Sequence, residues 1–113
     1  MSEFAFLFRG RDRKGSPYQM QKTMQKWVAW FKELGEAGHI KDPGNPLEDG
    51  GMMVRGKEKT VTDGPFAEAK DLVNGYIVIQ AKDLAEATEL AKGCPNLEID
   101  GSVEVQPIEE LGM

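Results

Sequence analysis

Two segments of the chain alternate between apolar and other positions with the period of a β-strand. In residues 3–9 (EFAFLFR) every second position is a phenylalanine, and residues 75–81 (GYIVIQA) alternate in a similar way. Successive side chains of a strand point to opposite faces, so each segment predicts a strand. Both faces of each segment are largely apolar, which is typical of a strand that is covered on both sides.

Two other segments have the spacing of an amphipathic helix. The longer one is predicted over residues 17–38, with Ser16 as its N-cap and Gln19 completing a capping box. The shorter one begins after the N-cap Asp83 and ends at Gly93. The apolar stripe of the longer helix, which we expect to face the core, consists of Met20, Met24, Trp27, Phe31 and Leu34.

The remaining apolar runs predict a short hairpin over residues 52–62 and a last strand over residues 102–108. Pro107 has no N–H, so that end of the last strand should lie at an edge of the sheet or outside the ladder. Residues 43–51 are rich in proline and glycine and are expected to form a loop. The order of elements predicts an α+β fold, a ferredoxin-like split βαβ arrangement with an extra β-hairpin.

The number of helices has a consequence for assembly. Two helices can cover only one face of such a sheet, and the strands predict that the other face is apolar too. An uncovered apolar face of this size is unfavourable in water, and pairing with a second copy would bury it. We therefore expect a homodimer.

Length and charge limit the number of domains and the classes of partner that the protein can have. The 113 residues suit a single domain over residues 1–113, and the net charge of −5 makes nucleic acid an unfavourable partner. Charge is uneven along the chain. Residues 1–59 hold 11 Lys/Arg and 8 Asp/Glu, a net +3, whereas residues 60–113 hold 3 and 11, a net −8.

Cysteine and histidine are nearly absent. The single Cys94 excludes an intramolecular disulfide and a cysteine-based zinc site, and the single His39 excludes a two-histidine metal site. No dinucleotide-binding or P-loop motif is present, so no cofactor and no metal are predicted. A metal site built from carboxylates that are scattered along the sequence is the open alternative. Cys94 follows the end of the second helix, where the partial negative charge raises a thiol pKa, so a nucleophilic role is not expected.

Targeting signals are also missing from the sequence. No apolar stretch approaches the length of a membrane span, and the start MSEFAFLFRG lacks the features of a signal peptide. Together with the single free thiol, this predicts a cytoplasmic protein without a membrane partner.

Several motifs give the chain a family resemblance. Residues 61–79 read VTDGPFAEAKDLVNGYIVI, with KGCPN at 92–96 and SVEVQPI at 102–108. With the opening EFAFLFRG, the helix MQKWVAWFKEL and the loop NPLEDGG, these runs resemble the YCII-related family, in the branch marked by a DGPF motif. The similarity extends over nearly the whole chain.

The resemblance carries its own expectations. It implies a ferredoxin-like α+β fold paired into a dimeric α/β barrel. Some branches resemble small-molecule enzymes that act on aromatic or lactone compounds, and other members occur beside alternative sigma factors. Some relatives are thought to use a His–Asp pair, but His39 matches no motif position of the family, which argues against a histidine-based mechanism here.

The DGPF motif supplies the candidate acid/base residues. Asp63 either forms the Asp-Gly-Pro turn or is a carboxylate held at a strand end, facing a cleft, where it would act as a general base or bind a ligand. Glu68 lies on the same side of an extended segment as Lys70. The two side chains form a solvated ion pair, or Glu68 serves as a second acid/base or ligand-binding group beside Asp63.

Two more residues are candidate ligand contacts. Arg9 ends the first strand and is followed by a flexible glycine, so it can anchor a carboxylate or phosphate, or simply be solvated. Trp30 is offset from the apolar stripe of its helix, so it can line a pocket, form a dimer contact or be partly buried.

Two functions follow from these residues. In the first, the protein is a small-molecule binder or enzyme with a cleft between the sheet and the long helix, where Asp63 is the base, Arg9 the anion anchor and Trp30 an apolar wall. In the second, the protein is a non-catalytic regulatory or protein-interaction module that presents its acidic second half to a partner. The family resemblance implies an association of this module with sigma-factor signalling.

Overall fold

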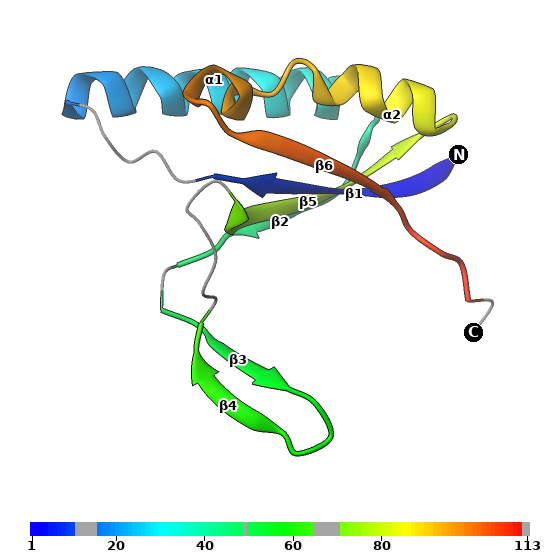
Figure 1. Cartoon of the computed structure of the whole chain (residues 1–113). Coiled ribbons are helices and arrows are strands. Elements are labelled where there is room, and N and C mark those ends of the chain that lie inside the picture. The colour runs from blue at the N-terminus through cyan, green and yellow to red at the C-terminus, as the bar shows by residue number, and fades with distance from the viewer. Residues whose placement is uncertain (11–15, 49, 65–70, 112–113) are drawn as a thin grey trace.

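A computed structural model describes residues 1–10, 16–48, 50–64 and 71–111 of the chain. A mixed sheet-and-helix architecture emerges, with both α-helices on one face of the main sheet (Figure 1). In chain order the elements are β1 (Ser2–Arg9), α1 (Pro17–Glu36), β2 (Ile40–Pro46), β3 (Met52–Arg55), β4 (Thr60–Asp63), β5 (Val73–Ala81), α2 (Leu84–Ala91), the 3₁₀-helix η2 (Pro95–Ile99) and β6 (Ser102–Pro107).

The main sheet is antiparallel, with the strand order β2-β5-β1-β6. This is the order of a ferredoxin-like arrangement, in which the two strands that precede the helices lie in the middle. The prediction of an α+β fold is therefore confirmed. β6 lies at an edge, as its proline requires.

The core lies between the sheet and the helices. Phe4, Phe6 and Phe8 alternate along β1 toward this side, where Ile77 and Ile79 of β5 lie beside them, because every second residue of a strand faces the same way. Full burial of each such side chain stabilises the fold by about 1.5–3 kcal/mol. Among the described residues, no helix is both long and apolar enough to cross a membrane.

The predicted helix caps are present. Ser16 Oγ accepts a hydrogen bond from the Gln19 N–H at 3.1 Å, and the Gln19 side chain accepts one from the Ser16 N–H at 3.0 Å. At α2, Asp83 accepts from the Glu86 N–H at 2.9 Å. These bonds satisfy backbone donors that a helix leaves free in its first turn, which is why the starts of both helices were predictable.

Residues 43–51 were expected to form a loop, but residues 43–46 belong to β2. Residues Ile40–Pro46 pair with β5, with two irregularities in the register, and hold two prolines that an edge strand tolerates. Gly44 makes the close approach possible, because its φ is 59° and a Cβ there would lie 1.8 Å from the Tyr76 carbonyl oxygen. The Pro-Gly-Asn-Pro composition that predicted a loop belongs to an irregular edge strand.

The face of α1 that meets the core also differs from the prediction. Met20 and Met24 were expected to be buried, but their side chains are 54% and 63% exposed. Trp30, expected at the side of the stripe, is 5% exposed and packs in the core together with Leu34. The buried residues of α1, Trp30 and Leu34, therefore both lie in the second half of the helix.

The face of the sheet away from the helices is called here the open face. Ala5 and Leu7 of β1 lie directly opposite Val78 and Tyr76 of β5 and form its half-buried apolar centre. β3 and β4 pair only with each other and project from the sheet on this side (Figure 1). No helix of the described chain covers the open face.

Candidate ligand-binding site

A cavity of about 460 Å³ lies between the first half of α1 and the sheet, and is called here the α1 cavity. It occupies the place where the sequence predicted a cleft. Its size falls within the range of about 300–1,000 Å³ that small-molecule sites have. Side chains from α1, β1, β2 and η2 contribute to its walls, among them Met20, Met24, Trp27, Phe31, Phe8, Pro46 and Ile99.

Three aromatic rings form the inner wall of the α1 cavity. Trp27 meets Phe8 edge to face, with ring centroids 4.9 Å apart and an interplanar angle of 83°. Phe31 lies on the other side of Trp27, with centroids 5.9 Å apart. The edge-to-face contact favours one relative orientation of Phe8 and Trp27, and the three rings together offer aromatic surface to a ligand.

Methionine forms the outer wall. Met20 and Met24 project from α1 above the cavity and are largely exposed, in contrast to the buried second half of the helix. Methionine is flexible and polarizable, and adapts to the shape of an apolar partner. The cavity thus combines a fixed aromatic wall with an adjustable methionine wall.

Three polar side chains around the cavity make hydrogen bonds within the fold. Asn96 is 1% exposed and donates both amide hydrogens, to the Arg9 carbonyl at 3.0 Å and to the Ser102 carbonyl at 2.8 Å. Thr23 donates to the Gln19 carbonyl at 3.0 Å, and the Asn74 amide donates to the Gly10 carbonyl. These bonds tie β1, β5 and η2 together and keep the inner wall in place.

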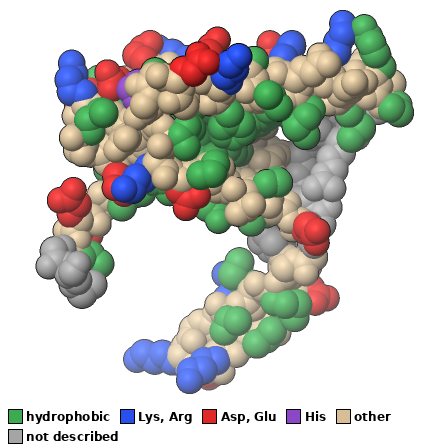
Figure 2. All heavy atoms as spheres, turned by 180° about the vertical axis from the view of Figure 1, so that it is seen from behind, with side chains coloured by type: hydrophobic (Ala, Val, Ile, Leu, Met, Phe, Trp, Pro, Cys, Tyr) green, Lys and Arg blue, Asp and Glu red, His purple; other side chains and the backbone are tan. Residues whose placement is uncertain are grey.

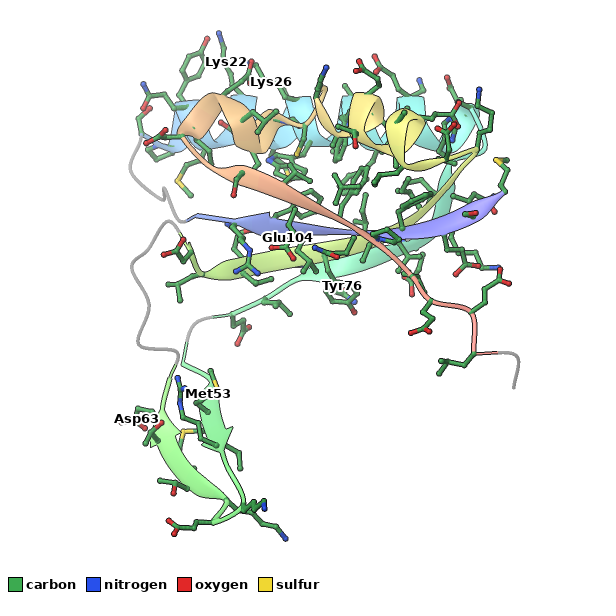
Figure 3. The ribbon with its side chains drawn as sticks, turned by 45° about the vertical axis from the view of Figure 1, so that its right-hand side comes forward. Lys22, Lys26, Met53, Asp63, Tyr76 and Glu104 are labelled. Atoms are coloured by element: carbon green, nitrogen blue, oxygen red, sulfur yellow. The ribbon has the colours of Figure 1, made fainter. Side chains whose placement is uncertain are left out.

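Arg9 lies on the open face, not in the α1 cavity. Its Nε donates to a Glu104 carboxylate oxygen at 3.1 Å, and another guanidinium nitrogen donates to the Asp71 carbonyl at 2.7 Å. Its side chain is therefore already paired with a neighbouring strand. Glu104 and Tyr76 are labelled on this side of the sheet in Figure 3.

Trp30 lies in the core beneath the second half of α1. Its ring stacks on that of Phe6 with centroids 6.2 Å apart, and its indole N–H donates to the Leu90 carbonyl at 3.3 Å. It borders a smaller hollow beside Lys26 and Gly93 but is not part of the α1 cavity wall. Trp27, which the sequence assigned to the core, is the tryptophan of the cavity.

Asp63 ends β4 and is exposed on the projecting hairpin, well away from the helices (Figure 3). It lies opposite Met52 in the ladder, and the following Gly64 N–H donates to the Gly51 carbonyl. Glu68, the other candidate carboxylate, lies outside the described residues. The structure therefore separates Asp63, Arg9 and Trp30 instead of bringing them together.

The sequence analysis did not identify the cavity residues Met20, Met24, Trp27 and Asn96 as functional. The three on the helix follow the same period as core residues, so no pattern within the helix separates cavity wall from core. Asn96 follows Pro95 in a turn-like segment, and nothing in that composition signals its burial.

Cys94 is buried at the start of η2, and burial in apolar surroundings raises its pKa to about 12. The thiol therefore stays protonated at neutral pH, which agrees with the expectation that it is not a nucleophile. Within the described ranges, no group of three or more His, Cys, Asp or Glu side chains is arranged to hold a metal ion.

Comparisons with known proteins identify a family and a solved structure of similar fold. A search of curated proteins finds no match. Among solved structures, the chain is similar to the 5-chloro-2-hydroxyhydroquinone dehydrochlorinase (TftG) of Burkholderia phenoliruptrix AC1100, in complex with 2,5-dihydroxybenzoquinone. The identity is 14%, the TM-score is 0.51, and 96% of this chain aligns with 94% of that one, so the similarity concerns the fold. The model of the YCII-related domain matches residues 4–111, and the chain belongs to that family.

Proposed function

We propose that this protein, a single domain of the DGPF branch acting in the cytoplasm, binds a small organic molecule in the α1 cavity. The observation that carries the proposal is the cavity itself, which has an aromatic inner wall fixed by the core and a methionine outer wall. A folded protein without a ligand rarely leaves such apolar surface open beside a helix, since its burial would be favourable.

The similarity to a solved structure also supports the binding of a small organic molecule. TftG carries a small ring compound in its solved complex, and the two chains share their fold over most of their length. The aromatic wall at Phe8, Trp27 and Phe31 suits a ring compound, because stacked and edge-to-face contacts contribute about 0.5–1.5 kcal/mol beyond burial.

A thermal-shift screen of small ring compounds tests the proposal. A ligand at 100 times its Kd stabilises the folded state by about 2.7 kcal/mol, which raises the melting temperature measurably. The shift should shrink in Met24→Ala and persist in Val28→Ala, which is equally exposed on α1 but outside the cavity wall. A library that leaves the melting temperature unchanged throughout would count against ligand binding.

We further propose that two copies pair through the open face into a dimeric α/β barrel, with the extra hairpin as an arm. The face of the hairpin with Met52, Val54 and Val61 is apolar and exposed. An isolated two-stranded hairpin is only marginally stable in water. The radius of gyration of 15.7 Å also exceeds the roughly 13 Å of a compact chain of this length.

The space-filling view supports an arm of this kind. Figure 2 shows hydrophobic side chains along the hairpin and a hollow between the hairpin and the rest of the molecule. A second copy would cover the open face and the hairpin together. Val78→Asp should shift the mass measured by light scattering from dimer to monomer, whereas Val28→Asp on the outside of α1 should not. A wild-type protein that is monomeric at micromolar concentration would exclude the dimer.

The dimer also gives the candidate carboxylate a place to act. Asp63 lies on the same face of the hairpin as Met52 and Val54, because directly opposed residues of a ladder share a face. If the hairpin packs against the open face of the partner, it places Asp63 there as a general base. Arg9 or Glu68 would then be ligand contacts. Asp63→Asn should then abolish turnover of a ligand bound at the open face, whereas binding in the α1 cavity, on the other side of the sheet, should stay unchanged.

A regulatory role is the second candidate, and the acidic second half of the chain favours it. Residues 60–113 have a net charge of −8, and carboxylates attract a basic protein partner, such as a sigma factor, most strongly at low salt. A pull-down at low ionic strength that retains a basic partner and loses it at high salt would support this role. Recovery of no partner at low salt would contradict it.

A further inference from the structure

The described residues that line the α1 cavity include no charged side chain. Apolar and aromatic side chains predominate, and the polar members are asparagine, glutamine and threonine. The chain is 29% charged overall, so a wall without Lys, Arg, Asp, Glu or His is a local departure from its composition. Such a wall has no counter-charge for an ionic ligand.

Several hydrogen-bond donors of the wall are engaged in the fold. Both amide hydrogens of Asn96 are donated to backbone carbonyls, and the Thr23 hydroxyl and the Asn74 amide each donate to another carbonyl. An anion is best compensated by a cationic side chain, and a cation needs carboxylates. The described residues that line the cavity supply neither.

We propose that the ligand of the α1 cavity is an uncharged ring compound, an inference that rests on the proposed binding function. The ring lies against Phe8, Trp27 and Phe31, and the flexible side chains of Met20 and Met24 close over its outer side. Charged analogues of the same ring are rejected because the wall cannot compensate their lost hydration. This assigns the selectivity to the wall and not to Arg9, whose guanidinium is paired with Glu104 on the open face.

Three probes with one ring system test the inference at neutral pH: 2-naphthalenemethanol, 2-naphthoate and 2-naphthalenemethylammonium. The two indole N–H signals of ¹⁵N-labelled protein separate the cavity from the core, because Trp27 lines the cavity and Trp30 donates its N–H to Leu90. The neutral alcohol should move the Trp27 signal, leave that of Trp30 nearly unchanged, and bind at least about tenfold more tightly than either ion.

The outcomes separate failure of the charge inference from failure of the proposed binding function. If an ion binds as tightly as the alcohol and moves the Trp27 signal, the proposed function stands and the charge inference is overturned. If none of the three probes moves the Trp27 signal, the binding function itself fails, and the inference fails with it. If the alcohol binds but moves only the Trp30 signal, the ligand occupies another site and the inference is wrong.

A charge placed in the wall sharpens the test. Met24→Lys adds a cation at the edge of the cavity and should narrow the preference for the alcohol over naphthoate by about two- to fivefold. Val28→Lys adds the same charge at a position 60% exposed and outside the wall, and should leave the preference unchanged. Equal narrowing in both variants would mean that net charge, and not the cavity wall, sets the preference.

Discussion

The two halves of α1 have the same kind of apolar sequence and opposite environments. The second half, with Trp30 and Leu34, is buried against the phenylalanines of β1. The first half carries Met20 and Met24 at the same helical spacing, yet both are exposed over a cavity. An apolar stripe on a helix therefore shows where a partner is needed, and that partner is the sheet at one end and, in our proposal, a ligand at the other.

The largest expected effect comes from the buried half. Trp30→Ala should lower the free energy of unfolding by about 3–5 kcal/mol, because it removes a stacked core ring and leaves a cavity. Trp27→Ala should lower the free energy of unfolding clearly less, since Trp27 is only half-buried. Equilibrium urea unfolding of both variants measures the difference. Equal losses would erase the distinction between the two halves.

A pH dependence follows from the thiol packed near the buried half. The pKa of Cys94 is raised to about 12 in the folded protein from an ordinary value near 9.0, so the thiol contributes stability that is fully present below pH about 9. That contribution is lost as the pH rises toward about 12, at up to about 1.4 kcal/mol per pH unit. Urea unfolding between pH 8 and about 10.5 should show a shallower decline for Cys94→Ala than for the wild type. Parallel declines would contradict the raised pKa.

The exposed half depends more on its own helix signals than on packing. Ser16→Ala removes the cap of α1 and should cost about 1 kcal/mol, whereas Ser16→Asn keeps a capping oxygen and should cost little. Amide hydrogen exchange should accelerate mainly in the first turns, around Met20, because the second half is held by the core. Uniform acceleration along α1 would show that the helix opens as one unit.

The smallest effect on stability is expected at the cavity wall. Met24→Ala should change the free energy of unfolding by less than about 0.5 kcal/mol, because the side chain is mostly in water. The same change should weaken the binding of a ring compound by about two- to tenfold, through lost contacts with the ligand. Calorimetric titration and urea unfolding of one protein sample measure both. A loss of stability without a loss of affinity would place Met24 in the fold instead of the site.

Much of the fold could be predicted from the chain. The alternation in β1 and β5, and the caps at Ser16 and Asp83, depend on residues close together in sequence, and the structure confirms them. β2 was missed because its identity depends on pairing with β5, whose partner residues lie 29 to 39 positions away and override the local preference for a loop. The register that places Gly44 against Tyr76 has no local signal.

The candidate site was predictable in its place but not in its residues. A cavity between the sheet and the long helix was expected and is present, yet Arg9 is paired on the open face and Trp30 is buried in the core. The two tryptophans lie three positions apart on one helix, so only the position of the sheet decides which one reaches the cavity. Whether Asp63 and Glu68 take part in the chemistry stays a prediction.

The sequence by itself determined the elements whose causes are local: the strands with period two, the helices with their caps, and the family that its motifs indicate. Tertiary structure alone decided which part of the α1 stripe is core and which is cavity wall, because that depends on how closely the rest of the chain packs against each part of the helix. Helical periodicity indicates that a side chain is favourably removed from water, but it does not indicate whether the core of the protein or a ligand covers that side chain.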